Sequence, residues 1–387
     1  MAALALAACS SPTSLNLPIA PSGSTQWQAQ GRAQRVCPRA RLGEGQCAAL
    51  IMSRPVGRGN TGPLGWAPAQ IQAAYHLPSS TKGGGQIVAI VDAYDNPHVA
   101  SDLATYRAYY GLPSANFSKF NQKGVQGKYP THDPGWGYEI DLDVEMVSAA
   151  CPNCTIYLVE ASSESKRNLE DAEVVAARLG AHVVSNSWGC YVTGCTWSAR
   201  AFKHPGVTYV AAAGDDGYGS YPPAHFANVV SVGGTVLSQS GSSYSEVVWS
   251  ATGGGCAPAI AKPSWQTDPS CPGRTSNDVS AVATGIAEYD SYRYAGWSEA
   301  EGTSASTPLI AAIFALAGNA SQQQGGKTFW TLSQSQRQND LHYIGSGTAN
   351  NCPPSLSGTY LCSAGTNEFG TYSGPAGWGT PNGIGAF

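Results

Sequence analysis

Short apolar runs and stretches of helical spacing alternate along most of this chain. Apolar runs bounded by glycines or turn residues predict buried strands over 86–92, 155–160, 182–186, 207–212 and 228–232. Apolar residues that recur at helical spacing predict helices over 100–110, 139–149, 166–179 and 309–316. Strands that alternate with helices indicate an α/β fold, in which helices cover both faces of a mostly parallel central sheet.

The N-terminal part lacks this periodicity. Residues 1–27 are predicted to be an export-signal remnant and a tether, residues 28–65 a lead-in that carries a Cys37–Cys47 pair, and residues 66–387 the main domain. The residues before Cys9 resemble a lipobox, whose cysteine is lipidated in bacterial lipoproteins, but a positively charged leader is missing and the match can also be chance. No run of 18 or more apolar residues occurs, so no transmembrane helix is predicted.

The composition excludes some classes of function. Only 12% of the residues are charged and the net charge is −4, which argues against a nucleic acid or an anionic membrane as partner. So few ionisable groups also limit charge repulsion in acid, which would suit an extracellular enzyme of acidic media.

Ten of the eleven cysteines are near neighbours in sequence, in the pairs Cys37 and Cys47, Cys151 and Cys154, Cys190 and Cys195, Cys256 and Cys271, and Cys352 and Cys362. Five short loops of this kind are typical of a disulfide-bearing exported protein. The Cys151-Pro-Asn-Cys154 motif leaves half a zinc site or a redox motif as an alternative.

The candidate chemistry begins with two acids four residues apart and a distant serine. In a helix, Glu139 and Asp143 would lie on one face, one turn apart. Ser304 lies in Gly302-Thr-Ser-Ala-Ser-Thr-Pro308, a turn that runs into an apolar helix. A serine nucleophile needs a neighbouring base, and that base needs a group that orients it, so these three residues suggest a peptidase. Most acid pairs at this spacing are solvated helix faces, which is the competing interpretation.

A histidine-based triad is a rival interpretation. None of the seven histidines lies in the His-Gly-Thr setting of subtilisin-type peptidases; they are His76, His98, His132, His182, His204, His225 and His342. Asp215 ends a predicted strand, where sites form in parallel sheets. It is either a plain turn residue or, when protonated, a hydrogen-bond donor to an oxyanion. Because carboxyl groups would act as base and donor, an acidic pH optimum is predicted.

From about Trp66 onward the chain resembles the sedolisin, or serine-carboxyl peptidase, family, and in particular its compact secreted bacterial members. The resemblance rests on Ile90–Pro97, Glu139–Asp143, Cys151–Cys154, Ser185–Gly189, Ala213–Gly217, Lys262–Gln266 and Gly302–Pro308. It implies a subtilisin-like fold and an acid endopeptidase or tripeptidyl-peptidase. Ser304 would be its nucleophile, Glu139 the base, Asp143 the residue that orients the base and Asp215 the oxyanion donor.

The resemblance also implies that Ser187, Trp188 and Gly189 lie beside a bound peptide, although Trp188 could equally be a core residue. The family's calcium site is expected to be lost, because Tyr343 and Ser373 stand where the family has aspartates. No cofactor is therefore expected. About 65 residues precede Trp66, fewer than the large prodomain of the family. A secreted or Cys9-anchored monomer acting on proteins or peptides is expected; the alternative is a catalytically silent surface or binding protein with the same fold.

Overall fold

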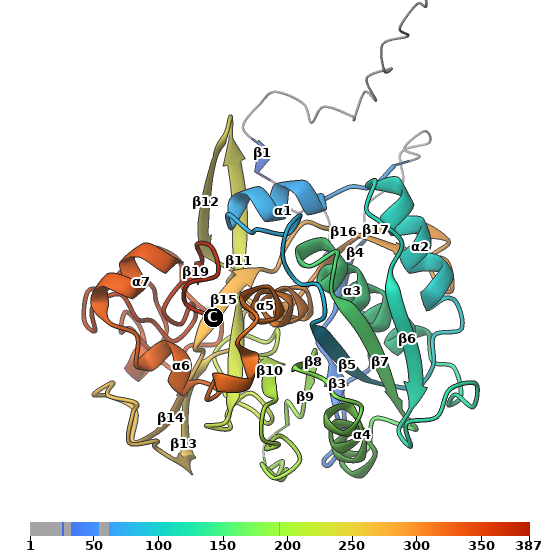
Figure 1. Ribbon diagram of the computed structural model, residues 1–387. Coiled ribbons are helices and arrows are strands. Elements are labelled where there is room, and N and C mark those ends of the chain that lie inside the picture. The colour runs from blue at the N-terminus through green and yellow to red at the C-terminus, as the bar shows by residue number, and fades with distance from the viewer. Residues whose placement is uncertain (1–24, 27–31, 54–61, 193) are drawn as a thin grey trace, which may run out of the picture.

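The computed structural model describes residues 25–26, 32–53, 62–192 and 194–387, and Cys9 lies outside them. Its largest sheet has nine strands (Figure 1). Seven follow in the spatial order β1 (Thr25–Gln26), β11 (Val229–Ser240), β10 (Thr208–Ala212), β8 (Val183–Asn186), β5 (Ile87–Ala93), β7 (Thr155–Ala161) and β6 (Asn116–Asn121). The other two, β12 (Ser243–Val248) and β15 (Val279–Val282), pair with β11. Only β1 and β12 run antiparallel to their neighbour, so the predicted mostly parallel sheet is confirmed.

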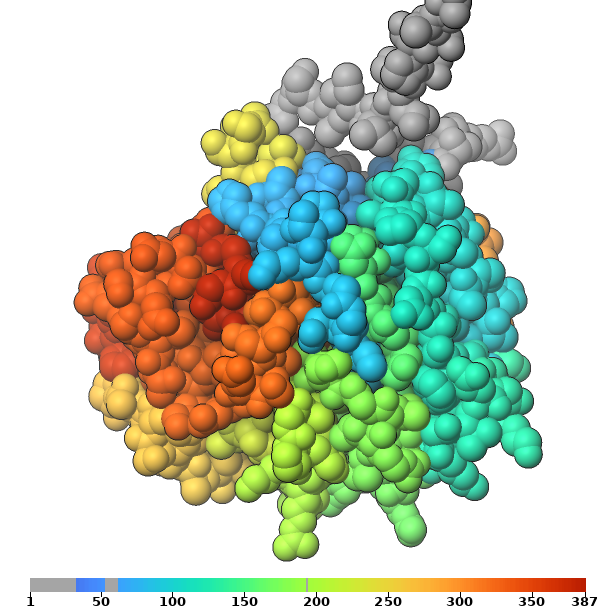
Figure 2. Space-filling model, in the orientation of Figure 1, coloured from blue at the N-terminus to red at the C-terminus, as the bar shows by residue number. Residues whose placement is uncertain are grey.

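Helices cover this sheet as predicted. The two central ones, α3 (Pro134–Ala150) and α5 (Thr303–Ala317), pack against each other and the sheet, and almost all of their residues are buried. Helix α2 (Val99–Tyr109) packs on α3. On the other face, α4 (Lys166–Arg178) packs on β5, β7 and β8. The short α1 (Pro68–Ala74) lies at the surface between the β11–β12 hairpin and α2 (Figures 1 and 2). An apolar helix such as α5 needs such a central position, because every side of it must be removed from water.

Small sheets complete the fold. β16 (Ile286–Asp290), β17 (Gly296–Glu301), β4 (Leu50–Ser53) and β2 (Arg32–Arg35) form an antiparallel sheet in that order. Two-stranded pairs join β3 (Gln46–Cys47) to β9 (Trp188–Gly189), β13 (Gly255–Ala261) to β14 (Gly273–Ser276), and β18 (Leu341–His342) to β19 (Thr380–Pro381). Short helices α6 (Lys327–Trp330) and α7 (Gln334–Asp340) lie beside the last pair. Residues 32–53 are thus tied into the main domain by two strands, β3 and β4.

All five predicted cysteine pairs form disulfides, at Cys37–Cys47, Cys151–Cys154, Cys190–Cys195, Cys256–Cys271 and Cys352–Cys362. The Cys151-Pro-Asn-Cys154 motif is therefore a disulfide here rather than part of a zinc site. Among the described residues, no helix has both the length and the apolar character needed to cross a membrane.

Candidate active site

Helix α3 carries two acids into the centre of the molecule. The helix begins at Pro134, and the Asp133 side chain caps it by accepting hydrogen bonds from the next backbone N–H groups. Glu139 and Asp143 lie one turn apart on this helix and are both 0% exposed. A solvated helix face therefore does not describe this pair.

The Glu139 carboxyl group lies among the other candidate residues. Burial raises its pKa well above the usual value, and the negative charge of Asp143 raises it further. The nearby Ser304 hydroxyl and a hydrogen bond from the Ala49 backbone lower this pKa, whereas Asp215 raises it. Oε2 accepts the Ala49 N–H at 2.8 Å. Glu139 is thus the residue that the other candidate groups surround.

Ser304 lies in the first turn of α5, and this helix begins directly after a glycine with a left-handed backbone. Gly302 has a φ of 132°, which only glycine adopts readily. The Ser304 side chain is fully buried, and its hydroxyl donates to the Ser187 carbonyl oxygen at 3.3 Å. The same hydroxyl lies near the Glu139 carboxyl group and lowers its pKa through a side-chain hydrogen bond.

Asp215 follows β10 and turns toward the start of α5. Its Oδ1 accepts the Thr303 N–H at 2.9 Å and the Thr303 hydroxyl at 2.8 Å, while Oδ2 accepts no hydrogen bond from the described residues. Burial raises the pKa of Asp215 to about 7, against the lowering effect of the two Thr303 bonds. In acid this carboxyl group is neutral, and its free oxygen can then donate a hydrogen bond.

A further acid, Asp92, lies near Asp143, and no sequence motif singled it out. Burial raises the pKa of Asp143 and the neighbouring Asp92 adds to this, while the Ser187 hydroxyl lowers it. Asp92 lies near the end of β5 and is itself fully buried, with a raised pKa that burial and then Glu139 explain. An acid near the carboxyl end of a parallel strand was the available sequence signal.

In strand β9, the Trp188 side chain packs in the core, whereas the backbone borders the site. Trp188 is 0% exposed, its ring nitrogen donates to the Val91 carbonyl oxygen at 2.6 Å, and it packs on Trp197. The backbone of β9 pairs antiparallel with β3. The side chain of Trp188 is thus a core residue, while the strand itself lies beside an extended peptide segment of this same chain.

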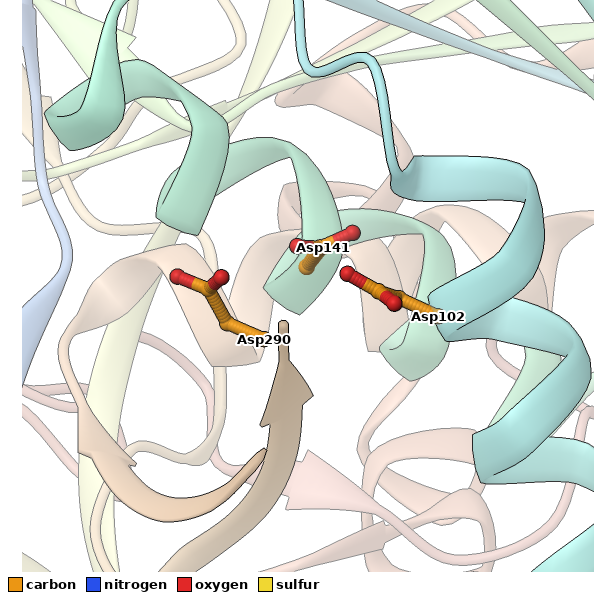
Figure 3. A group of neighbouring side chains, drawn as sticks. All are labelled: Asp102, Asp141 and Asp290. Atoms are coloured by element: carbon orange, nitrogen blue, oxygen red, sulfur yellow. The ribbon is translucent and has the colours of Figure 1, made fainter. Parts of the chain in front are cut away.

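A second acidic cluster includes a residue of α3 that lies on a different face of this helix from Glu139 and Asp143. Asp141 of α3, Asp102 of α2 and Asp290 at the end of β16 lie close to one another (Figure 3). They are buried, and one oxygen of each lies within 4.8 Å of the others, a donor set of the kind that a hard cation uses. Burial, Asp102 and Asp290 all raise the pKa of Asp141, so shared protons could equally hold this cluster together.

The stretches that match the family's calcium site offer a different environment. Tyr343 is 47% exposed, and Ser373 is buried. The cavity beside Tyr343 has no aspartate or glutamate among its lining residues, which include Arg337 and Trp378. The Arg337 guanidinium stacks 3.5 Å from the centre of the Trp378 ring. A cation beside aromatic rings makes this region a poor fit for calcium.

Known proteins are similar to this chain in sequence and in fold. The sequence model of the subtilase family matches residues 129–370. Kumamolisin of Bacillus sp. (strain MN-32) is 30% identical over 65% of this chain and 52% of its own length. Sedolisin of Pseudomonas sp. (strain 101) is 25% identical over 91% of this chain and 63% of its own length. The chain thus spans about half to two thirds of the relatives it matches.

A solved structure shows the same fold. The structure of Pseudomonas sedolisin (serine-carboxyl proteinase) complexed with two molecules of pseudo-iodotyrostatin superposes with a TM-score of 0.68 at 24% sequence identity. The superposition covers 83% of this chain and 96% of that one. The subtilisin-like architecture that the resemblance implied is therefore confirmed.

Proposed function

The chain belongs to the sedolisin family of subtilisin-like serine peptidases, and on this premise we propose that it hydrolyses peptide bonds in acid through Ser304, Glu139 and Asp143. The observation that supports this most is that Ser304, Asp143 and Asp215 surround the buried carboxyl group of Glu139. These residues come from three different elements of the fold, α3, α5 and the turn after β10.

The proposed reaction follows the usual course of acyl transfer. Glu139 accepts the Ser304 proton as Oγ attacks the carbonyl carbon, and then donates that proton to the leaving nitrogen. Asp143 holds Glu139 in position. A neutral Asp215 donates from Oδ2 to the oxyanion. Water then releases the acyl group from Ser304 by the reverse proton transfers.

The electrostatics favour acidic pH. A carboxyl group is a useful base only near its own pKa, and burial raises the pKa of Glu139. Asp215 donates a hydrogen bond only in its protonated form, and its pKa of about 7 keeps it protonated in acid. Activity therefore requires a pH low enough to keep Asp215 protonated, that is, below about 7.

Two further features bear on the substrate and the location. Residues on both sides of Ala48 lie along the site, so an extended chain can pass through it, which favours an endopeptidase over a tripeptidyl-peptidase. Five disulfides are typical of secreted proteins. We therefore expect an extracellular monomer that acts on unfolded protein or peptide substrates.

Labelling with a serine-directed fluorophosphonate tests this proposal. After incubation in acid, the wild-type chain should be labelled, and Ser304→Ala should not. Ser306→Ala is the matched control, because Ser306 lies two residues away on the same helix and donates to the Ala281 carbonyl oxygen at 2.9 Å; it should retain labelling. An unlabelled wild-type chain that also leaves unfolded protein intact would favour the silent binding protein instead.

A further inference from the structure

The Tyr191 side chain lies between two backbone segments of the proposed active site. A Cβ atom on Gly189 of β9 would stand 2.7 Å from the Tyr191 Cε1 atom and 3.0 Å from its hydroxyl oxygen. A Cβ atom on Gly214, the residue before Asp215, would stand 2.6 Å from the same Cε1 atom. The ring can therefore lie against both segments only because residues 189 and 214 have no side chain.

The hydroxyl end of the Tyr191 ring lies near the acids of the site. Burial raises the pKa of Tyr191 well above its usual value, and the charges of Asp215 and then Glu139 raise it further. The hydroxyl oxygen is buried and has no hydrogen-bond partner in the described part of the chain. Tyr191 is therefore a residue of the proposed site, although it takes no part in the proposed proton transfers.

The backbone before Tyr191 and the ring itself are both held in place. The Cys190 N–H donates to the Pro222 carbonyl oxygen at 3.0 Å, and Cys190 forms a disulfide with Cys195. The ring of Tyr221 packs edge-on against that of Tyr191, and the two ring centres are 5.7 Å apart. An aromatic pair of this geometry on a fixed backbone resists displacement of the Tyr191 ring by a bound peptide.

The substrate side chain that precedes the cleaved bond starts close to this ring. In the proposed reaction, Ser304 Oγ attacks a carbonyl carbon whose oxygen accepts a hydrogen bond from Asp215 Oδ2. The Cα atom that carries the side chain is bonded to this carbonyl carbon, about 1.5 Å away. The peptide is expected to run along β9, whose edge pairs antiparallel with the extended β3. The space between β9 and Asp215 therefore receives that side chain.

The Tyr191 ring occupies the part of this space that lies between Gly189 and Gly214. Protein interiors are closely packed, so a second large side chain cannot share the space with the ring. A methyl or hydroxymethyl group needs far less room. Two glycines that faced an empty slot would instead admit a large apolar side chain. The size of residue 191 thus sets the size of the side chain that the site can accept.

We propose that Tyr191 is a specificity-determining residue, an inference that rests on the proposed peptidase function. Its ring fills the pocket for the substrate side chain that precedes the cleaved bond, so the chain cleaves after small residues such as glycine, alanine and serine. Large residues such as leucine and phenylalanine are excluded at this position. The ring rather than the hydroxyl group causes the exclusion, because the exclusion depends on volume.

The test identifies, by mass spectrometry, the bonds that are cut in an acid-denatured protein at about pH 4, after incubation of each chain in acid. We expect the wild type to cut after small residues, and Tyr191→Ala to cut after leucine and phenylalanine as well. Two peptides that differ only in alanine or phenylalanine before the cleaved bond quantify the change. In Tyr191→Ala, the ratio of kcat/KM for the phenylalanine peptide to that for the alanine peptide should rise at least about tenfold.

Two further variants serve as controls. Tyr191→Phe keeps the ring and should therefore keep the wild-type ratio. Tyr109→Ala removes a tyrosine of α2 that is 45% exposed, and it should also leave the ratio unchanged. Labelling of each variant by a fluorophosphonate in acid checks that the variant is folded and that its Ser304 is reactive.

The outcomes separate this inference from the proposed function. If the wild type cuts after leucine or phenylalanine as readily as after alanine, the inference is wrong and the peptidase function stands; this result requires no variant. The same conclusion follows if a labelled Tyr191→Ala chain keeps the wild-type ratio, or if Tyr191→Phe changes the ratio as Tyr191→Ala does. If the wild type neither hydrolyses the denatured protein nor reacts with a fluorophosphonate, the proposed function fails and the inference with it.

Discussion

Burial of a carboxyl group changes the protonation state that it holds at a given pH, and each acid of the site is affected. Glu139, Asp143 and Asp215 are buried with raised pKa values, and burial is the first cause for each of them. The three groups differ in their partners: Glu139 faces an amide N–H, Asp143 another acid and Asp215 a threonine. These partners suit a base, an orienting group and a donor.

Two variants of Asp215 test its role as a hydrogen-bond donor to the oxyanion. The Asp215→Asn variant retains an N–H donor at every pH, so its kcat should lack the fall that the wild type shows as Asp215 ionises near its pKa of about 7. The Asp215→Ala variant has no donor and should lose about 10²–10³ in kcat at pH 4, as other oxyanion holes do. Measuring kcat from pH 4 to 8 checks this. An Asp215→Asn profile identical to that of the wild type would contradict the assignment.

At the residue scale, the sequence predicted the groups that motifs mark. The spacing of Glu139 and Asp143 and the turn at Ser304 indicated residues that the fold does bring together. Asp92 was missed because its only signal was its position near the carboxyl end of a predicted strand, and a single acid in an apolar run forms no motif. Ala49 was missed because alanine carries no chemical signal, and its contact with Glu139 is a backbone hydrogen bond that only the fold reveals.

At the element scale, the long elements were predictable and the short ones were not. Strands such as β5 and helices such as α5 bury nearly every residue, so their apolar runs are clear in the sequence. Strands β2 and β3 have four and two residues, with polar side chains among them, and leave no periodicity to read. The pairing of β3 with β9 depends on tertiary structure alone.

The region near the C-terminus that matches the family's calcium site leads to a prediction about metal ions. We propose that the calcium site of the family is lost here, because the cavity beside Tyr343 has no carboxylate in its lining and Arg337 stacks there. A chelator should therefore leave the melting temperature of the Ser304→Ala chain unchanged. A chelator-induced fall that Asp141→Asn abolishes would contradict this prediction and place an ion at the aspartates of Figure 3.

At the scale of the whole molecule, the buried acids make stability depend on pH. Besides the site residues, several fully buried acids have raised pKa values, namely Asp92, Asp141, Glu145, Glu173 and Glu288. The folded state keeps their protons at pH values where the unfolded chain releases them. Their stabilising contribution is therefore fully present below about pH 4, the unfolded value, and is lost as the pH rises toward the folded values.

Urea unfolding of the Ser304→Ala chain, which cannot digest itself, tests this dependence. The midpoint should fall from pH 4 to pH 7. In the Asp215→Asn/Ser304→Ala variant, the urea midpoint should fall less steeply with pH between the ordinary Asp215 pKa of 3.8 and its folded value of about 7, because residue 215 no longer titrates. A midpoint that rises over this range would show that the acids are ionised in the folded protein.

The rate of hydrolysis of an acid-denatured protein between about pH 3 and pH 8 tests the central claim most directly, with the wild-type chain incubated in acid beforehand and Ser304→Ala as the reference. Our account predicts a rate that is highest below about pH 6, because Asp215 must hold its proton to donate a hydrogen bond to the oxyanion, and a loss of at least about 10³-fold in Ser304→Ala. A rate that peaks at neutral or alkaline pH, or one that survives in Ser304→Ala, would contradict it.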